Sequence, residues 1–338
     1  GGTLIQHLKE LQLHTDISSK DTIFYYTTCG WMMWNWLVSS LSLGSTIVLY
    51  DGSPFFPNGE VLINMIDKLG ITVFGTSAKY ISALESANIL PKKISKQLTL
   101  RTILSTGSPL VDKNYKFVYS NWKSDVQLSS ISGGTDIISC FGLGNPLLPV
   151  YSGELQSKGL GMKVESFDDN GNSIINKIGE LVCTLAFPSM PIYFWNDEEN
   201  KLYNKAYFNK YKNIWHHGDL LEITDYGGIK IYGRSDTTLN PGGVRIGTAE
   251  IYQAVEIVDE IEDSIVVGKK VEGDEQIILF VKLKKDITLD NDLKNKIKFS
   301  IRDMCTARHL PSKIFAVDAI PFTLSGKKVE LAVRHIIN

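Results

Sequence analysis

The sequence lacks an excess of either charge and has no apolar run long enough to span a membrane. Its net charge is −2, which gives no general attraction to nucleic acid or to anionic membranes. The most apolar stretch, residues 31–43, is shorter than the ~20 residues that a span requires, and it contains Asn35. We therefore expect a buried helix there, no membrane span and no nucleic-acid partner. No protein partner can be inferred from the sequence.

Cysteines are few and unpaired in sequence. The four lie far apart, at positions 29, 140, 183 and 305, so none has the spacing of a metal-binding pair. Free, buried thiols in a reducing cytosol are the expected state. No signal peptide is visible, but the chain begins at Gly1 without a Met, so a start further upstream would hide one.

Three common nucleotide or nucleophile motifs are also absent. The sequence has no Walker loop, no Gly-x-Gly-x-x-Gly after a strand and no Gly-x-Ser-x-Gly elbow. These absences argue against a P-loop enzyme, a dinucleotide-binding enzyme and a serine hydrolase.

What the sequence does contain is a layered α/β pattern over residues 1–150. Leu4, Leu8 and Leu11 predict one face of a first helix, and residues 31–43 predict a second. Apolar runs at 46–50, 71–74 and 102–105 predict buried strands, the first of them bounded by Gly44 and by Asp51-Gly52. Helices between these runs indicate a parallel sheet with right-handed crossovers.

The pattern changes twice after residue 150. Short strands separated by frequent turns predict a β-subdomain over 151–235, with a hairpin turn at 168–171 directly after residues 162–167 and further strands at 179–183 and 228–232. Residues 236–338 predict a small α+β domain. There a helix over about 290–304 carries apolar residues at four-residue spacing, and strands are expected at 277–283 and 314–317.

Two glycine-rich turns stand where open α/β sheets bind ligands, beyond the carboxyl ends of strands. Thr106-Gly107-Ser108-Pro109 follows one predicted strand. Ser132-Gly133-Gly134-Thr135-Asp136 combines glycines, a hydroxyl and a carboxylate, a composition suited to a phosphate with Mg²⁺. Each turn alone is weak evidence, because such turns are common.

Asp219, Arg234 and Asp236 are polar residues near the predicted boundary between the domains. Asp219 follows a glycine and could accept hydrogen bonds from ribose hydroxyls, but a plain turn aspartate remains an alternative. Arg234 suits hydroxyl or phosphate binding, and Asp236 suits a hinge, although an ordinary linker explains both. His216 and His217 are adjacent, so they should point in different directions, and a metal site there is disfavoured.

Two further motifs lie in the last hundred residues. Asn240-Pro-Gly-Gly-Val-Arg245 is a glycine-rich turn before a helix that opens at residues 247–250. Ser325-Gly326-Lys327 places a lysine on a turn, where a point charge could stabilise a developing phosphorane. Taken alone, an exposed turn lysine is the commoner explanation.

Taken in order, these motifs resemble those of the adenylate-forming acyl-CoA synthetase superfamily. The connecting sequence is closest to the branch that activates acetoacetate, at residues 26–38, 132–140 and 324–333. The resemblance implies ATP, Mg²⁺ and CoA as cofactors, an acyl-AMP intermediate and a mobile small C-terminal domain. It also implies a role in lipid synthesis from ketone bodies and a cytosolic location.

The resemblance also implies site roles. These are adenine contact by Gly107, Ser108 and Pro109; α-phosphate binding by Thr135; Mg²⁺ binding by Asp136; ribose binding by Asp219 and Arg234; phosphate binding by Arg245; CoA contact by Gly243; a hinge at Asp236; and catalysis of adenylation by Lys327.

Two departures from the superfamily pattern affect the prediction. Gly133, beside Gly134 in the acyl pocket, stands where acetate-activating relatives have a tryptophan, which favours acetoacetate over acetate. The expected phosphate loop should lie just before Gly1, so we expect a piece of a longer enzyme. The alternatives are a synthetase for another short acid and a truncated, non-catalytic nucleotide-binding protein.

Overall fold

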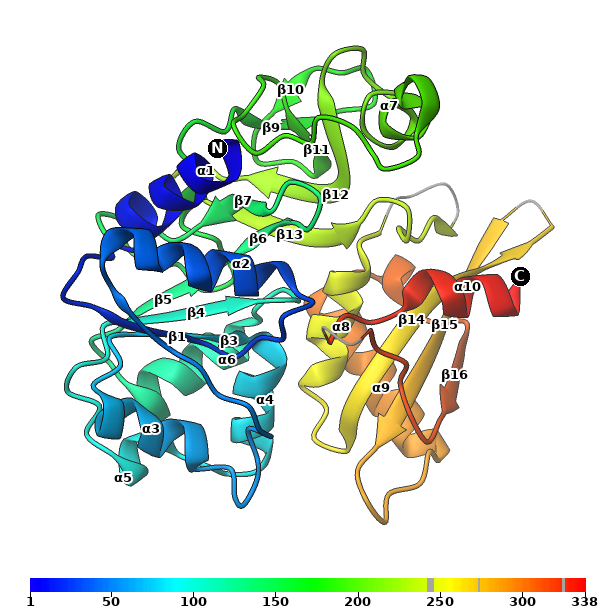
Figure 1. The fold of residues 1–338 in the computed structure, drawn as a ribbon. Helices are drawn as coiled ribbons and strands as arrows, with labels where there is room; N and C mark the ends of the chain where they lie inside the picture. Colours follow the sequence, from blue (N-terminus) through cyan, green and yellow to red (C-terminus); the bar gives the residue numbers. More distant parts are fainter. Residues whose placement is uncertain (242–245, 273, 324–325) are drawn as a thin grey trace. The chain divides into compact units, whose positions relative to one another are not determined.

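The computed structural model describes residues 1–241, 246–272, 274–323 and 326–338 (Figure 1). The chain divides into two compact units. The first comprises residues 1–217 and 222–230, and the second comprises residues 218–221 and 231–338.

A parallel five-stranded sheet organises the first unit, as predicted. Its strand order is β2-β1-β3-β4-β5, and every pair of neighbours is parallel. The strands are β1 (Thr22–Tyr25), β2 (Thr46–Val48), β3 (Val73–Ser77), β4 (Thr102–Thr106) and β5 (Gln127–Ser130). One prediction was wrong: β2 is not buried, because it forms the edge of the sheet and is shorter than the apolar run at 46–50.

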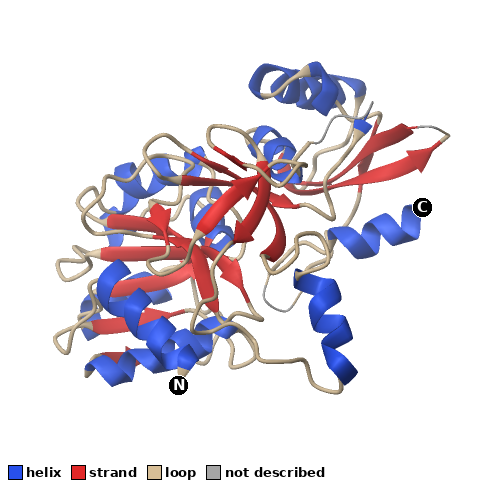
Figure 2. Cartoon of the chain, turned by 90° about the horizontal axis from the view of Figure 1, so that it is seen from above, coloured by secondary structure: helices blue, strands red, loops and turns tan. Residues whose placement is uncertain are grey.

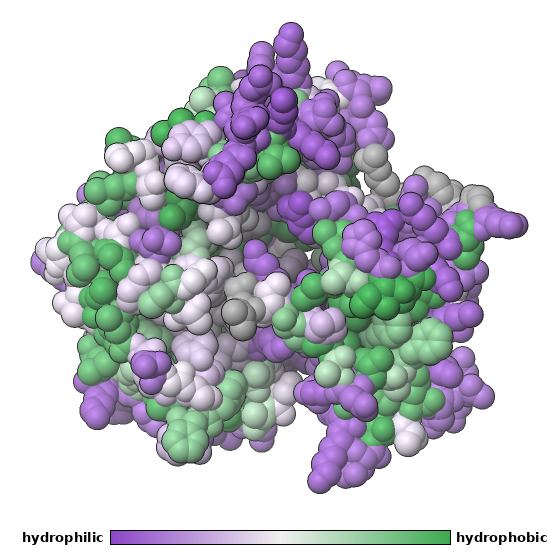
Figure 3. Space-filling model, turned by 45° about the vertical axis from the view of Figure 1, so that its right-hand side comes forward, coloured by the Kyte–Doolittle hydropathy of each residue, from purple (hydrophilic) through white to green (hydrophobic). Residues whose placement is uncertain are grey.

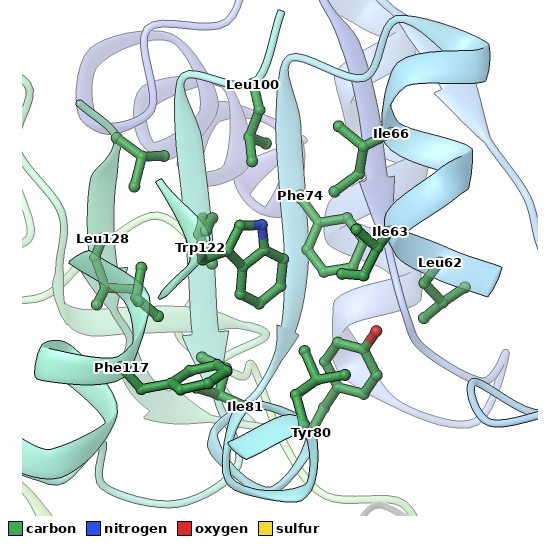
Figure 4. Close-up of a cluster of buried hydrophobic side chains, with 14 of the residues drawn as sticks. Leu62, Ile63, Ile66, Phe74, Tyr80, Ile81, Leu100, Phe117, Trp122 and Leu128 are labelled. Atoms are coloured by element: carbon green, nitrogen blue, oxygen red, sulfur yellow. The ribbon is translucent and has the colours of Figure 1, made fainter. Parts of the chain in front are cut away.

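Helices cover both faces of this sheet (Figures 1 and 2). One face packs against α3 (Val61–Leu69), α4 (Ala78–Ser86), α5 (Pro91–Ile94) and α6 (Asp112–Phe117). Figure 4 shows this core, with the indole of Trp122 beside Phe74 and with Ile63 against the same phenyl ring. The ring centroids of Phe74 and Trp122 lie 5.6 Å apart. The other face packs against α2 (Met32–Ser39) and against Leu11, which lies in the π-helical turn after α1 (Gly2–Lys9).

Helix α1 does not bury the face that its leucines predict. Leu4 is 42% exposed, whereas Gln6, His7 and Glu10 are buried. The helix continues as one π-helical turn, Glu10–His14, in which Leu11 is fully buried. A polar face can be buried here because its side chains have hydrogen-bonding partners, described below.

Antiparallel strands follow the parallel sheet in the chain. One sheet has the order β10-β9-β11-β12-β13, and a smaller one has the order β6-β7-β8. The predicted hairpin is confirmed, because Asp168 accepts hydrogen bonds from the backbone N–H groups of Asn170 and Asn172. The strands are β6 (Ser132–Gly134), β7 (Ser139–Leu143), β8 (Ser157–Lys158), β9 (Val164–Phe167), β10 (Ser173–Ile174), β11 (Gly179–Cys183), β12 (Trp215–Ile223) and β13 (Ile229–Arg234). Helix α7 (Lys201–Tyr207) lies between β11 and β12 in sequence.

The second unit has its own sheet and its own core. Its strands are β14 (Ile261–Val271), β15 (Asp274–Leu283) and β16 (Lys313–Ala316), and its helices are α8 (Thr248–Glu256), α9 (Asn291–Met304) and α10 (Glu330–Ile337). The stripe predicted on α9 is confirmed, since Leu293, Ile297 and Ile301 are buried in this core.

Hydrophilic and hydrophobic residues are interspersed over the face shown in Figure 3. Lys282 pairs with Glu262 and Lys296 with Glu260, at 2.5 and 2.8 Å.

Among the described residues, none of the helices combines the length and apolar character needed to cross a bilayer. All four cysteines are free, but Cys29 is exposed, which corrects the expectation that every thiol is buried.

Candidate active site

The parallel sheet brings two of the predicted motifs together. Residues 107–109 follow β4, residues 132–136 follow β5, and these strands are parallel neighbours. Two hydrogen bonds join the end of β4 to Ile131, which follows β5. The N–H of Ile131 donates to the carbonyl of Ser105, and the hydroxyl of Thr106 donates to the carbonyl of Ile131, each at 2.8 Å. Both motifs therefore lie at the carboxyl edge of the sheet, where such folds bind ligands.

Gly107 has a backbone conformation that favours glycine. Its φ is +94°, and a Cβ built there would lie 4.0 Å from the indole of Trp31. Steric strain at this φ, rather than lack of space, is therefore the reason for glycine. Ser108 and Pro109 are exposed directly after this turn.

The turn between β6 and β7 presents Thr135 and Asp136. The N–H of Ile138 donates to the carbonyl of Thr135 at 3.0 Å, and Ile138 has a φ of +47°. Thr135 and Asp136 are exposed in this turn. The hydroxyl of Tyr207, from α7, donates to the carboxylate of Asp136. A hydroxyl and a carboxylate are thus held next to each other at the edge of the sheet.

Close packing explains both glycines of the turn. A Cβ on Gly133 would lie 2.0 Å from the carbonyl oxygen of Ser139, in the facing strand β7. A Cβ on Gly134 would lie 2.5 Å from Cε1 of His217. The close approach of the β7 backbone therefore requires glycine at 133. This packing reason is separate from the predicted effect of Gly133 on the acyl pocket.

A buried polar network lies behind this hairpin. The carboxylate of Glu10 accepts hydrogen bonds from the hydroxyl of Ser139, from the N–H of Cys140 at 3.1 Å and from the indole N–H of Trp36 at 3.0 Å. His7 Nε2 lies 2.6 Å from the carbonyl oxygen of Ile138. Helix α1 therefore fixes the strand that leaves the Thr135–Asp136 turn.

Lys9 belongs to the same buried region. Its Nζ lies 3.6 Å from Glu10 Oε1. Burial lowers the pKa of Lys9, although the Glu10 carboxylate acts in the opposite direction. The two residues are adjacent in sequence, so this ion pair is a local contact behind the hairpin.

The second unit assembles a different group of predicted residues. Arg234 makes a two-point contact with Asp236, at 3.3 and 3.2 Å, and its Nη1 lies 3.4 Å from Oδ1 of Asp219. Gly218 permits this arrangement, because it has a φ of +81° and a Cβ there would lie 2.9 Å from Nη2 of Arg234. Asp219, Arg234 and Asp236 thus form one cluster within the second unit.

Asp219 is buried in this cluster. Burial raises its pKa to about 6, against the lowering effect of the Arg234 and Lys327 charges. A pKa of about 6 is high for an aspartate.

Lys327 lies on a closed turn of the second unit. The N–H of Thr323 donates to the carbonyl of Lys327 at 2.8 Å, and the N–H of Lys327 donates to the Thr323 hydroxyl at 3.1 Å. Gly326 has a φ of +80°, and the Lys327 side chain is exposed. Neighbouring Lys328 instead contacts Asp263 at 3.1 Å and lies 3.8 Å from the ring centroid of Tyr252.

Two predicted residues, Gly243 and Arg245, lie outside the described residues. The helix predicted after them is present as α8, where the N–H of Gly247 donates to the carboxylate of Glu250 at 3.2 Å. Within the described chain, no group of three or more His, Cys, Asp or Glu side chains forms a metal cluster.

Sequence reasoning missed an aromatic cluster, formed by Tyr207 and Trp215, beside the Thr135–Asp136 turn. Tyr207 stacks on Trp215 at 3.6 Å, and Trp215 donates through Nε1 to His217 Nδ1 at 3.3 Å. His216 instead bonds to Glu180 at 2.9 Å, so the two histidines do point apart as expected. The sequence signal was the high density of aromatic residues, at positions 203, 207, 208, 211 and 215. That Tyr207 of this segment contacts Asp136 could be seen only from the fold.

Comparison with solved structures defines the class of protein. An anthranilate CoA ligase in complex with anthranoyl-AMP matches the fold with a TM-score of 0.83 at 17% identity, over 100% of this chain and 63% of that one. The chain therefore has the fold of the acyl-adenylate-forming synthetases.

More similar proteins identify the branch. The acetoacetyl-CoA synthetase of Streptomyces lividans matches with a TM-score of 0.93 at 43% identity, over 99% of this chain and 52% of that one. The acetoacetyl-coenzyme A synthetase of Rhizobium meliloti strain 1021 is 53% identical over 338 residues, which is 100% of this chain and 52% of that protein. The chain is thus homologous over its whole length to the acetoacetyl-CoA synthetases. It spans about half the length of these relatives, and no family model matches it.

Proposed function

We propose that this chain supplies part of an enzyme that joins acetoacetate to CoA at the expense of ATP, giving acetoacetyl-CoA, AMP and pyrophosphate. The observation that carries the proposal is the 53% identity over all 338 residues to an acetoacetyl-coenzyme A synthetase. The geometry supports it, because the sheet edge holds residues 107–109 beside the Thr135–Asp136 turn.

The first half-reaction forms acetoacetyl-AMP. A carboxylate oxygen of acetoacetate attacks the α-phosphorus of ATP, and the bond from that phosphorus to the bridging oxygen breaks to release pyrophosphate. Residues 107–109 contact the adenine, Asp219 and Arg234 bind the ribose hydroxyls, and Thr135 binds the α-phosphate. Lys327 stabilises the charge that develops on the phosphorus. Arg245 binds phosphate in the same scheme.

Asp136 is the residue of this chain that suits Mg²⁺. Mg²⁺ is usually held by one or two carboxylates together with the phosphates of the nucleotide, and not by a cage made only of protein groups. An exposed carboxylate on the phosphate-binding turn fits that pattern, and Tyr207 orients it. When bound there, the ion would neutralise phosphate charge.

The second half-reaction transfers the acyl group. The CoA sulfur attacks the carbonyl carbon of acetoacetyl-AMP, the bond from carbon to phosphate oxygen breaks, and the thiol proton is lost. In this proposal residues 236–338 form a mobile domain that turns about Asp236, withdraws Lys327 and lets CoA enter along Gly243. Residues 1–235 form the part that retains the adenylate. The acyl group lies at Gly133 and Gly134.

The cellular setting follows from the same proposal. An enzyme that makes acetoacetyl-CoA from the free acid supplies ketone-body carbon to lipid synthesis. Four cysteines that are all free support a reducing compartment such as the cytosol.

Pyrophosphate release from ATP tests the function. Acetoacetate, acetate and butyrate are compared with and without CoA, using this chain and any longer product of the same gene. We expect acetoacetate to give the highest kcat/KM and CoA to allow repeated turnover. Preference for another acid would show a synthetase of different specificity. AMP binding without turnover by the longest product would show a non-catalytic nucleotide-binding protein.

A further inference from the structure

The turn that carries Lys327 is closed at its base by backbone contacts. Lys328 pairs with Phe322 as an isolated antiparallel bridge, and Thr323 exchanges hydrogen bonds with Lys327 inside it. These contacts fix the backbone of the turn. They do not by themselves direct the Lys327 charge, because a lysine carries its ammonium group on a flexible four-carbon stem.

The side chain of Lys328 is directed into the second unit. Its Nζ lies 3.1 Å from Oδ1 of Asp263 and 3.8 Å from the centroid of the Tyr252 ring. The Lys328 side chain is 18% exposed, whereas Lys327 is an exposed residue. A cation that lies over an aromatic face and beside a carboxylate is held by two attractive interactions. The Lys328 ammonium group is therefore fixed in one direction.

Tyr252 also holds the chain beyond Lys328. Its hydroxyl donates to the carboxylate of Glu330, the first residue of α10, and accepts from the N–H of Val266 at 3.1 Å. Burial raises the pKa of Tyr252, and the Glu330 carboxylate adds to this effect, so the hydroxyl remains a donor. One tyrosine thus contacts two of the three residues that follow Lys327.

The residues that hold this segment lie on rigid elements of the same unit. Tyr252 lies on α8 beside Ile251, which is fully buried, and Asp263 lies on β14, which also contributes Val266 to the core. Helices α8 and α10 both pack against β14 (Figure 1). A supporting side chain that is locked by packing gives a defined position to the residue that it contacts.

These contacts also distinguish two adjacent lysines. Lys327 and Lys328 lie on one turn and carry the same charge. The contacts with Asp263 and Tyr252 draw Lys328 into the unit and fix the backbone from which the Lys327 side chain starts. Such support matters in an active site, because a displacement of about 1 Å can lower a rate by about 10²-fold.

We propose that Lys328 is a positioning residue for adenylation, which directs Lys327 by its own contacts with Tyr252 and Asp263. This inference rests on the proposed function, in which Lys327 stabilises the charge that develops on phosphorus. Lys328 does not contact the nucleotide in this scheme, so its whole effect on the rate passes through Lys327.

The test uses variants of the active gene product that contains this chain. Lys328→Met removes the charge but keeps a long, unbranched side chain, and Lys328→Arg restores a cation. Lys296→Met is the matched control, because it breaks another lysine–carboxylate pair of the second unit, the one with Glu260. Acetoacetyl-AMP formation and thioester formation from added acetoacetyl-AMP are measured separately.

We expect Lys328→Met to slow acetoacetyl-AMP formation by about 10- to 30-fold and to change thioester formation by less than about threefold. Lys328→Arg should recover part of the loss, and Lys296→Met should leave both rates near those of the wild type. An equal loss in both half-reactions would show that Lys328 only supports the fold. An unchanged rate of adenylation would show that it does not position Lys327. Either result overturns the proposal.

A double-mutant cycle tests whether the effect passes through Lys327. In a Lys327→Ala background, Lys328→Met should slow adenylation by less than about twofold, because no lysine at position 327 remains to be directed. The same loss in both backgrounds would show that Lys328 acts on the reaction independently, and it would overturn the proposal.

A measurement on the unaltered protein covers the case in which the variants do not fold. Reductive methylation read by mass spectrometry should modify Lys327 about tenfold faster than Lys328, whose amine is held by Asp263 and Tyr252. Equal labelling rates would overturn the inference. Failure of the proposed function has a different signature, namely a wild-type protein that forms no acetoacetyl-AMP although its Lys328 is still labelled slowly.

Discussion

Lys327 and Lys328 are neighbours in sequence, but the structure gives them different surroundings. Lys328 forms an ion pair with Asp263 and lies over the ring of Tyr252, so its charge is paired within the second unit. Lys327 is exposed on a turn closed by Thr323. A lysine held on a short turn is a point charge that another part of an active site can use. Of the two residues, Lys327 is therefore the one that fits the proposed role in adenylation.

Replacing Lys327 with alanine should separate the two half-reactions. We expect acetoacetyl-AMP formation to fall by about 10²–10³-fold, the effect of losing one electrostatic donor aimed at the reacting centre. Thioester formation from preformed acetoacetyl-AMP should change by less than about fivefold, since no charge develops on phosphorus near the lysine in that step. Both rates can be measured in stopped assays. Lys313→Ala, another exposed lysine of the same unit, is the control. Equal damage to both half-reactions contradicts the assignment.

The raised pKa of Asp219 predicts a pH dependence of nucleotide binding. Its pKa is about 6, compared with 3.8 for an unperturbed group. Between these values the folded chain holds a proton that the unfolded chain has lost, so this group lowers stability as pH rises from 3.8 to about 6. The ionised form accepts from ribose hydroxyls through both oxygens, whereas protonation turns one of these oxygens into a donor and removes the charge. AMP affinity should therefore fall as the pH drops below about 6, by at most tenfold per pH unit.

Calorimetric titration of AMP between pH 5 and 8 tests this expectation. The Asp219→Asn variant should bind more weakly and should show only the titration of the nucleotide itself. A wild-type profile that parallels the variant would exclude Asp219 as the titrating group.

At the scale of elements, helix α1 and the π-helical turn that continues it support the hairpin that carries Thr135 and Asp136. Three donors from α2 and β7 converge on the Glu10 carboxylate, and His7 reaches the carbonyl of Ile138. A buried carboxylate that satisfies several donors is costly to remove, because each donor then loses its partner without regaining water. The stability of the hairpin therefore depends on a helix more than 120 residues earlier in the chain.

Substitution of Glu10 should be strongly destabilising. We expect Glu10→Leu to lower the free energy of unfolding by about 3–5 kcal/mol. The substitution leaves the three donors without an acceptor and Lys9 without its counter-charge. Glu10→Gln should cost less, since its amide oxygen still accepts. Ile5→Ala is the control in the same helix, because Ile5 is 60% exposed and should change stability by less than about 0.5 kcal/mol. Urea titration measures all three variants. A Glu10→Leu protein as stable as wild type would show that the network carries no net stability.

Some elements could be predicted because their periodicity matches their burial. Helix α9 buries the residues that its four-residue spacing indicates, and β4 buries its continuous apolar run. Helix α1 could not be predicted in this way, because its buried face is polar and its partners lie in β7. Likewise, residues 107–109 and 133–136 were recognisable as turns. The convergence of Tyr207, Trp215 and His217 on one of them depends on long-range packing that no local pattern records.

At the scale of the whole molecule, each of the two units contains its own hydrophobic core. Phe74 and Trp122 belong to one core, and Ile251 and Leu279 belong to another. The predicted hinge, Asp236, pairs with Arg234 through its side chain and accepts from Arg334 through its carbonyl. Independent cores allow two bodies to move while each stays folded. A reaction with two half-steps can use that freedom to present different residues in turn.

Restricting the backbone at Asp236 should therefore uncouple the half-reactions. Proline fixes φ near −65°, so Asp236→Pro should favour one arrangement of the two bodies. We expect one half-reaction to stay within about threefold of wild type and the other to fall by about 100-fold or more. Asp236→Ala removes the contact with Arg234 but leaves φ unrestricted, so both steps should be affected only mildly. Separate assays of acetoacetyl-AMP formation and of thioester formation from added acetoacetyl-AMP give the two rates. If the proline and alanine variants lose both steps in parallel, residue 236 stabilises the boundary between the bodies and is not the hinge about which they turn.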